Sequence, residues 1–107
     1  MKQFRILAVL VLTLSTFALG WIQVTNVPTD ERQSTSTWLN NQYLVCWSDA
    51  RDWGIYSAAT IRGARISSSG AVLDANSFLI DGGYPDRLMP KICAGNSNWM
   101  IAYQQGC

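Results

Sequence analysis

Few residues in this chain have side chains suited to catalysis, and histidine is absent from all 107 positions. Without histidine, the chain can form no Ser-His-Asp triad, no Cys-His pair and no histidine-based metal site. Three cysteines, Cys46, Cys93 and Cys107, are the remaining nucleophile candidates, and no general base is encoded beside any of them. We therefore expect no catalytic residue, no metal ligand and no cofactor in this chain, which is predicted not to be an enzyme.

Asp49 and Asp52 form the closest pair of carboxylates that could act as general acid and base on a glycosidic bond. Polar residues are common where a strand ends, however, and both aspartates lie at such a position. An ion pair or turn hydrogen bond between Asp49 and either Arg51 or Arg65 is the better explanation. Residues 81–86 offer carboxylates for calcium, but their two glycines suit a turn equally well and the spacing of an EF-hand is absent.

Four of the five tryptophans divide into two groups. Trp47 and Trp99 lie in strongly apolar segments and are expected to pack in the interior. Trp38 borders a turn and Trp53 lies in a loop, so each of these two could present an indole plane to a sugar ring. They are the aromatic residues that the sequence singles out as candidates for ligand contact.

The cysteines are predicted to serve packing rather than cross-linking. Cys46 lies inside an apolar segment, where a free thiol packs like a small apolar side chain, and packing is also expected for Cys93. Cys107 is interpreted as a loose terminal residue. A disulfide between Cys46 and Cys93 would require their two strands to meet, which the sequence leaves open.

The segments that carry these residues recur along the chain at a constant offset. Apolar residues 43–47 recur as residues 99–103, 56 positions later, and the same offset aligns Asp30 with Asp86. The alternation of a strand puts three large residues of each run on one face: Tyr43, Val45 and Trp47 in the first, Trp99, Ile101 and Tyr103 in the second. Because the opposite face is also apolar, both runs must be covered on both sides, which predicts a small sheet stacked between two like sheets.

Turn signals divide the rest of the chain into short strands. Asn and Gly tolerate positive φ, which predicts hairpin turns at residues 39–42, 67–70 and 95–98, with Gly70 in the left-handed region of the second. The expected extended segments are 31–38, 43–47, 55–62 with room for a bulge, 61–66, 71–74 continued or doubled by 78–81, 87–93, and 99–103. The predicted class is all-β: an antiparallel four-stranded sheet plus the first hairpin of a second, behind an N-terminal signal helix.

Residues 1–20 have the pattern of a secretory signal peptide. A basic start precedes an apolar run at residues 6–14, and Ala18 and Gly20 are small residues of the kind that signal peptidase recognises. Cleavage between Gly20 and Trp21 would place the mature chain outside the cell, in the periplasm or at the cell surface. The alternative is an uncleaved membrane anchor, because residues 6–24 approach the roughly 20 residues needed to cross a bilayer.

Net charge limits the partners of the mature chain. Only Lys2 and Arg5 of the eight basic residues lie before residue 21, which leaves six basic residues against seven acidic ones. This balance provides no basic patch for nucleic acid or for an anionic membrane surface. Contact with a membrane is expected only if the N-terminal segment is not cleaved.

The order and spacing of the segments resemble tandem repeats of secreted bacterial proteins, a family whose repeats are described as four-stranded blades of a β-propeller. The resemblance covers residues 30–103 and rests on Gln42-Tyr43-Leu44-Val45-Cys46-Trp47, Asp49-Ala50-Arg51, Ile61-Arg62-Gly63-Ala64-Arg65-Ile66-Ser67, Gly70-Ala71-Val72-Leu73-Asp74 and Ile80. It implies the signature residues Tyr43, Val45, Trp47, Asp49, Arg51, Gly63, Arg65, Gly70, Leu73, Asp74, Trp99, Ile101 and Tyr103. Arg62 stands where the family has an aromatic residue, and residues 53–60 look like an irregular connection.

The repeat and the resemblance divide the chain into a signal peptide (1–20), a linker or first strand (21–29), one blade-like repeat (30–85) and a partial second repeat (86–107). Propellers close with about four to eight blades, so we expect further blades of the same chain, which is interpreted as an N-terminal fragment. The predicted function is an exported, non-catalytic scaffold for a protein or carbohydrate that the sequence does not identify. The alternative is the N-terminal part of a secreted propeller hydrolase that acts on glycans.

Overall fold

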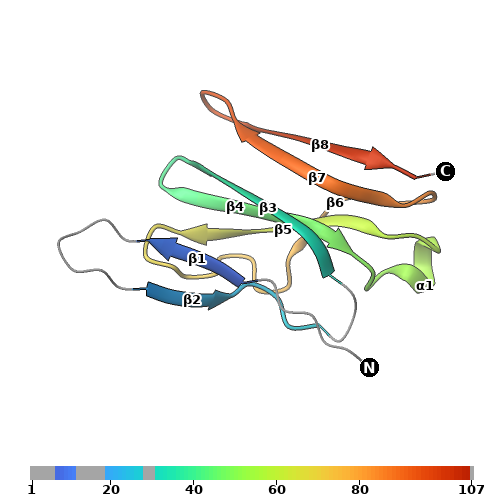
Figure 1. Ribbon diagram of the computed structural model, residues 1–107, viewed down its shortest axis with the longest axis horizontal. Helices are drawn as coiled ribbons and strands as arrows, with labels where there is room; N and C mark the ends of the chain where they lie inside the picture. The colour runs from blue at the N-terminus through green and yellow to red at the C-terminus, as the bar shows by residue number, and fades with distance from the viewer. Residues whose placement is uncertain (1–6, 12–18, 28–30, 107) are drawn as a thin grey trace.

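The computed structural model describes residues 7–11, 19–27 and 31–106, and its strands are paired antiparallel (Figure 1). The elements of these residues are β1 (Leu7–Val11), β2 (Leu19–Gln23), β3 (Glu31–Leu39), β4 (Gln42–Asp49), α1 (Trp53–Tyr56), β5 (Thr60–Ser67), β6 (Phe78–Asp81), β7 (Arg87–Ala94) and β8 (Trp99–Gln105). β1–β2 and β7–β8 are two-stranded sheets, and β3–β4–β5–β6 is a four-stranded meander. The prediction of an all-β chain with a four-stranded sheet and a following hairpin is confirmed.

Two residues in the left-handed region close the hairpin between β3 and β4. Asn40 and Asn41 have φ values of 55° and 60°, a conformation that asparagine tolerates and that matches the twist of the flanking strands. Leu39 and Gln42 are the last paired residues on either side. The turn predicted at residues 39–42 is therefore confirmed, with its two asparagines as the loop residues.

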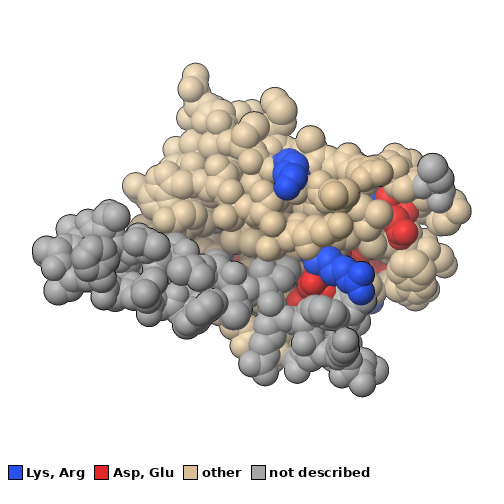
Figure 2. Space-filling model, viewed as in Figure 1, with Lys and Arg blue, Asp and Glu red and all other residues tan. Residues whose placement is uncertain are grey.

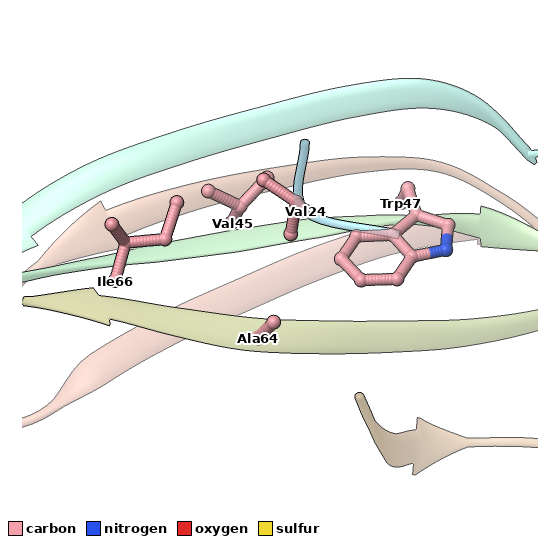
Figure 3. Packing of buried hydrophobic residues seen from close by; sticks show 5 residues of the cluster. All are labelled: Val24, Val45, Trp47, Ala64 and Ile66. Carbon is pink, nitrogen blue, oxygen red and sulfur yellow. The ribbon is translucent and has the colours of Figure 1, made fainter. Parts of the chain in front are cut away.

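β4 is buried on both of its faces. On one face, Val45 and Trp47 pack against Ala64 and Ile66 of β5 and against Val24, which follows β2 (Figure 3). The Trp47 side chain at the centre of this cluster has 0% of its surface exposed. Burial predicted for Trp47 is thus confirmed.

The opposite face of β4 carries Leu44, Cys46 and Ser48, which are also buried. β7 lies across this face, and the Ser48 hydroxyl donates a hydrogen bond of 2.9 Å to the carbonyl of Arg87. Two layers therefore enclose β4, as its apolar character on both faces predicts.

The fourth strand of the larger sheet is β6, so the fourth strand expected at residues 71–74 is wrong. Residues 71–74 contribute one isolated bridge, between Val72 and Ile66. The strand pairing ends here because the Asp74 carboxylate, in place of a backbone carbonyl, accepts the Arg65 backbone N–H at 2.8 Å. The Arg65 guanidinium adds hydrogen bonds of 2.9 and 3.0 Å to the same carboxylate. β6 then pairs with the beginning of β5.

The helix α1 stands where the sequence predicted extended chain from residue 55. The Asp52 carbonyl accepts the N–H groups of Ile55 and Tyr56 at 2.9 and 3.0 Å, which begins one helical turn. Ser57, with φ of 52°, ends it. The expected bulge lies just after, where the register of β5 with β6 shifts near the first residues of β5.

The described part of segment 1–20 is strand rather than the expected signal helix. β1 has the sequence Leu-Ala-Val-Leu-Val, whose β-branched residues suit a strand, and it pairs with β2. Residues 1–6 and 12–18 lie outside the described residues. Among the residues that the structure describes, no helix is long and apolar enough to cross a membrane. The predicted cleavage between Gly20 and Trp21 falls within β2 and stays a prediction.

Candidate functional site

The hairpins β3–β4 and β7–β8 have the same backbone pairing at equivalent positions. Register pairs of the first hairpin have these counterparts in the second: Glu31–Asp49 and Arg87–Gln105, Arg32–Ser48 and Leu88–Gln104, Thr35–Cys46 and Lys91–Ala102, Ser36–Val45 and Ile92–Ile101, Thr37–Leu44 and Cys93–Met100, and Trp38–Tyr43 and Ala94–Trp99. Both registers also shift at the same place, between residues 32 and 35 and between residues 88 and 91. The offset found in the sequence is therefore present in the pairing of the strands.

At each register shift one residue has a positive φ, which is 58° at Gln33 and 53° at Met89. These equivalent residues contact each other, because the Met89 N–H donates a hydrogen bond of 2.8 Å to Gln33 Oε1. β3 and β7 lie side by side in neighbouring sheets (Figure 1). We call the junction between the four-stranded sheet and β7–β8 the seam.

Asp49 ends β4, and both of its carboxylate oxygens are occupied. Trp47 Nε1 donates to Oδ2 at 2.7 Å, and the Arg51 backbone N–H donates to Oδ1 at 2.8 Å. The Arg51 guanidinium adds contacts of 3.0 Å to Oδ1 and 2.9 Å to Oδ2. The expected ion pair of Asp49 is therefore with Arg51 and not with Arg65. A buried carboxylate that accepts this many hydrogen bonds is unsuited to proton transfer with a substrate.

Asp52, the second carboxylate of the candidate acid–base pair, binds a different arginine. Its Oδ2 accepts a hydrogen bond of 2.8 Å from Arg62 Nη1, and Arg62 Nε donates to the Ser77 hydroxyl at 2.8 Å. Arg62 stands where the repeats that the sequence resembles have an aromatic residue, and here its guanidinium binds Asp52 and Ser77. The structure therefore does not bring Asp49 and Asp52 together as a pair.

Glu31 is buried beside Asp49, and the sequence assigned it no role. Thr25 Oγ1 donates to Glu31 Oε1 at 2.6 Å, and Arg51 Nη2 lies 3.5 Å from the same oxygen. Within the described residues, Glu31 Oε2 has no hydrogen-bond partner. Burial raises the pKa of the Glu31 carboxyl above its ordinary value of 4.5, against the lowering effect of the Thr25 hydroxyl. Pairing β3 with β4 as a hairpin places Glu31 opposite Asp49, and this register is the signal from which a role for Glu31 could have been predicted.

We expect Glu31→Gln to stabilise the chain more at pH 7 than at pH 4. The pKa of Glu31 is higher in the folded than in the unfolded chain, so the unfolded state ionises first as the pH rises above 4.5, and wild-type stability falls through that window. Glutamine keeps an acceptor for Thr25 and does not ionise. Urea unfolding at both pH values measures the gap between variant and wild type, and an equal gap at pH 4 and pH 7 would contradict the prediction.

Most of the remaining signature residues of the first repeat have structural roles. Arg65 holds Asp74, and this hydrogen bond from the guanidinium lowers the pKa of the Asp74 carboxyl. At Gly63, a Cβ would lie 2.9 Å from Ile80 Cδ1 of β6 and 3.1 Å from the Val45 carbonyl oxygen, so a larger residue would require these neighbours to shift. Gly70 has φ of 91° in the predicted turn. Leu73 is exposed, and no described contact explains its side chain.

A second polar cluster joins β6 to the hairpin β7–β8. The Asp81 carboxylate accepts hydrogen bonds from the Tyr103 hydroxyl and from Arg87 Nε, the latter at 2.6 Å, and both contacts lower its pKa. Arg87 and Tyr103 are the counterparts of Glu31 and Trp47 in the second hairpin. Each hairpin is therefore anchored at the same place to the segment that precedes it, through different side chains.

The carboxylates considered for calcium hold the chain connections instead. Asp81 is bound as described, and Asp86 Oδ1 accepts the backbone N–H of Ala59 at 2.7 Å. Among the residues that the structure describes, no three His, Cys, Asp or Glu side chains gather as a metal site requires. The connection from β6 to β7 is thus tied to the start of β5.

Cys46 and Cys93 are free thiols in different surroundings. Burial raises the pKa of the Cys46 thiol to about 11, so packing is confirmed for this residue. Packing expected for Cys93 is wrong, because its side chain lies on an uncovered face of β7–β8. Cys107 lies outside the described residues.

A cleft of about 220 Å³ opens at the seam. It is lined by Arg32, Ser48, Asp49, Ala50, Trp53, Ala59, Asp86 and Leu88, and we call it the seam cleft. Trp53, on α1, is 52% exposed. Trp38 lies outside the cleft, at a hairpin turn, where its ring meets that of Tyr43 edge-on with centroids 4.6 Å apart. The structure therefore places one of the two candidate sugar-contacting tryptophans in a hollow.

The two hairpins differ most in the exposure of one face: the outer face of β7–β8 is uncovered, whereas the equivalent face of β4 is buried. Met100 is 68% exposed, whereas its counterpart Leu44 is 3% exposed, and Ala102 is also exposed. In Figure 1 this hairpin forms one edge of the layered arrangement. On its inner face Trp99 and Ile101 are half-buried, so the interior position expected for Trp99 is only partly reached.

Taken together, the polar clusters connect strands and sheets, whereas the seam cleft and the outer face of β7–β8 are open to partners. On the face drawn in Figure 2, charged side chains of the described residues are few, and where they gather, basic and acidic ones lie side by side and form no extended area of one sign. Comparison of the chain with protein-family models, with curated proteins and with solved structures finds no match in any of the three.

Proposed function

We propose that this chain is an exported, non-catalytic repeat segment of β-propeller type that serves as a binding or surface-interaction scaffold. The observation that carries the proposal is the contrast between two equivalent positions, Leu44 and Met100. Leu44 is 3% exposed because the next hairpin covers it, and Met100 is 68% exposed. The same backbone pairing thus leaves one hairpin covered and the other open.

Further blades of the same chain are the proposed cover. β4 is paired along both edges, with β3 and with β5, whereas β8 is paired only with β7 among the described strands. An unpaired edge beside an exposed apolar face favours the addition of strands, and burial stabilises by about 25 cal/mol for each Å² of apolar surface. A blade of the same pattern would supply a β5-like strand at the edge and a β7-like strand across the face.

The carboxylates support the non-catalytic part of the proposal. The acidic side chains nearest to a hollow accept hydrogen bonds from arginines or from backbone N–H groups. The signal-peptide pattern of residues 1–20 supports the export part of the proposal. The N-terminal sequence of the mature product tests export directly. Trp21 is the expected first residue, and a start at Met1 would overturn cleavage.

Extension of the chain by one repeat tests the scaffold. A second copy of residues 50–105 is joined after Gln105, where the constant offset of the repeat places it in register. We expect amide hydrogen exchange in β8 to slow by about tenfold or more, because its edge becomes paired and its face covered. The control carries a scrambled version of the same added segment. Equal exchange rates in β8 of the extended, scrambled and original chains would overturn the proposal.

A further inference from the structure

The seam cleft combines an exposed aromatic plane with polar groups. Trp53 supplies the plane. Its helix, α1, has no buried residue, so the indole does not serve the core as Trp47 does. Large aromatic side chains that remain half-exposed beside a hollow are suited to contact with a ligand ring.

The polar lining of the cleft is balanced in charge. Asp49 is ion-paired with Arg51, and the indole N–H of Trp47 donates a hydrogen bond to it. The other charged residues of the lining are Arg32, which is cationic, and Asp86, which is anionic. A lining with charges of both signs favours neither an anion nor a cation, and a neutral ligand with hydroxyl groups suits it better.

Hydrogen-bonding groups are available at the cleft in fixed positions. Asp86 uses Oδ1 to accept the Ala59 N–H at 2.7 Å, and this bond orients the carboxylate while its Oδ2 accepts no hydrogen bond from the described residues. The Ser48 hydroxyl donates to the Arg87 carbonyl and keeps its lone pairs as acceptors. A carboxylate oxygen, a hydroxyl and an aromatic face are the contacts that a pyranose ring can use together.

We propose that the seam cleft binds one ring of a neutral saccharide, stacked on Trp53 and hydrogen-bonded to Asp86. This names a ligand class for the proposed scaffold, and it rests on that proposal only for its biological setting. The volume of about 220 Å³ lies below the roughly 300–1,000 Å³ of sites for larger ligands. One ring therefore enters the cleft, and the rest of the saccharide extends into solvent. Because the cleft lies at a junction between repeats, additional repeats would multiply weak sites and raise avidity.

Saturation-transfer NMR with four neutral probes tests the site: maltotriose, cellotriose, tri-N-acetylchitotriose and methyl α-mannoside. We expect at least one probe to bind the full chain with a dissociation constant on the order of 1 mM. Trp53→Ala is expected to weaken that binding by about tenfold or more, and Asp86→Asn, which keeps Oδ1 as an acceptor for Ala59, by several-fold. Trp38→Ala is the matched control, because it removes an exposed tryptophan outside the cleft.

Three outcomes would overturn the proposal: no binding of any of the four probes, binding unchanged in Trp53→Ala, or equal losses in Trp53→Ala and Trp38→Ala. Circular dichroism of each variant shows that a lost signal is not lost folding, and Asp86→Asn supplies a second test if Trp53→Ala is unstable. The repeat extension requires no ligand and the saccharide titration requires no second repeat. Either proposal can therefore fail while the other stands.

Discussion

Arg51→Met is expected to lower the free energy of unfolding by about 3–5 kcal/mol, because it leaves two buried carboxylates without their cation. The Arg51 guanidinium contacts Asp49 at 2.9 Å and Glu31 at 3.5 Å, and both acidic side chains are fully buried. Methionine fills a similar volume but supplies no charge and no donor. Urea unfolding monitored by circular dichroism measures the loss.

The matched control for Arg51→Met is Arg65→Met. Arg65 also binds one aspartate through its guanidinium, but its side chain is 43% exposed and solvent screens the pair. We expect this variant to lower stability much less than Arg51→Met does. If the two variants cost the same, the Asp49–Arg51–Glu31 cluster does not stabilise the fold in the way its burial indicates.

Trp47→Ala is expected to cost about 3–5 kcal/mol through the cavity it leaves in the core. The Trp47 ring packs among Val24, Val45 and residues of β5, and its Nε1 donates to Asp49 at 2.7 Å. Substitution therefore removes apolar contacts and one donor to a buried carboxylate. Because Val24 lies before β3, the variant should also loosen the attachment of the N-terminal segment, measurable as faster amide exchange at residues 23–27.

Two further variants separate the contributions at Trp47. Trp47→Phe keeps most of the ring but lacks the N–H, so its cost reports chiefly on the hydrogen bond to Asp49. Trp38→Ala truncates a tryptophan that is 44% exposed and is expected to cost about 1 kcal/mol, the worth of its edge-on contact with Tyr43. A loss in Trp38→Ala as large as that in Trp47→Ala would contradict the assigned core.

Asp49, the partner of Arg51 in the first prediction, was considered for acid–base chemistry, and its contacts show a structural use instead. Asp49, Arg51 and Glu31 are held in one cluster, and Asp81 and Arg87 in a second. The clusters fix the preceding segment to each hairpin. The seam cleft is therefore the candidate site for a ligand. Of the residues considered for catalysis in the sequence, only Asp49 lines this cleft.

What the sequence by itself determined about this protein is local in origin. The constant offset of the repeat, the all-β class, the turn at Asn40 and Asn41, and the burial of β4 on both faces all follow from residues close together in the chain. An apolar run needs cover wherever it lies, and a turn needs residues that tolerate positive φ whatever the strands pack against. The sequence also predicted an ion pair of Asp49 but left Arg51 and Arg65 open as its partner, and the structure shows Arg51.

Only the tertiary structure decided the features that depend on how sheets stack. The sequence predicted the fourth strand at residues 71–74, but the fourth strand is β6. Residues 71–74 form only one bridge with β5, because the Asp74 carboxylate binds the Arg65 backbone N–H. Glu31 became buried, although its neighbours in the sequence are polar, because Thr25 and Arg51 converge on it. Cys93 and Met100 are exposed although they resemble core residues, because no described layer covers β7–β8.

The seam cleft belongs entirely to this second class. Its walls come from segments that are far apart in sequence, such as Arg32, Trp53 and Asp86, and they meet because Gln33 and Met89 join equivalent strands across the seam. Neighbouring residues encode periodicity and turns, whereas a cleft between sheets depends on side chains that meet only after stacking. That is why the sequence could single out Trp53 but could not place it beside Asp86.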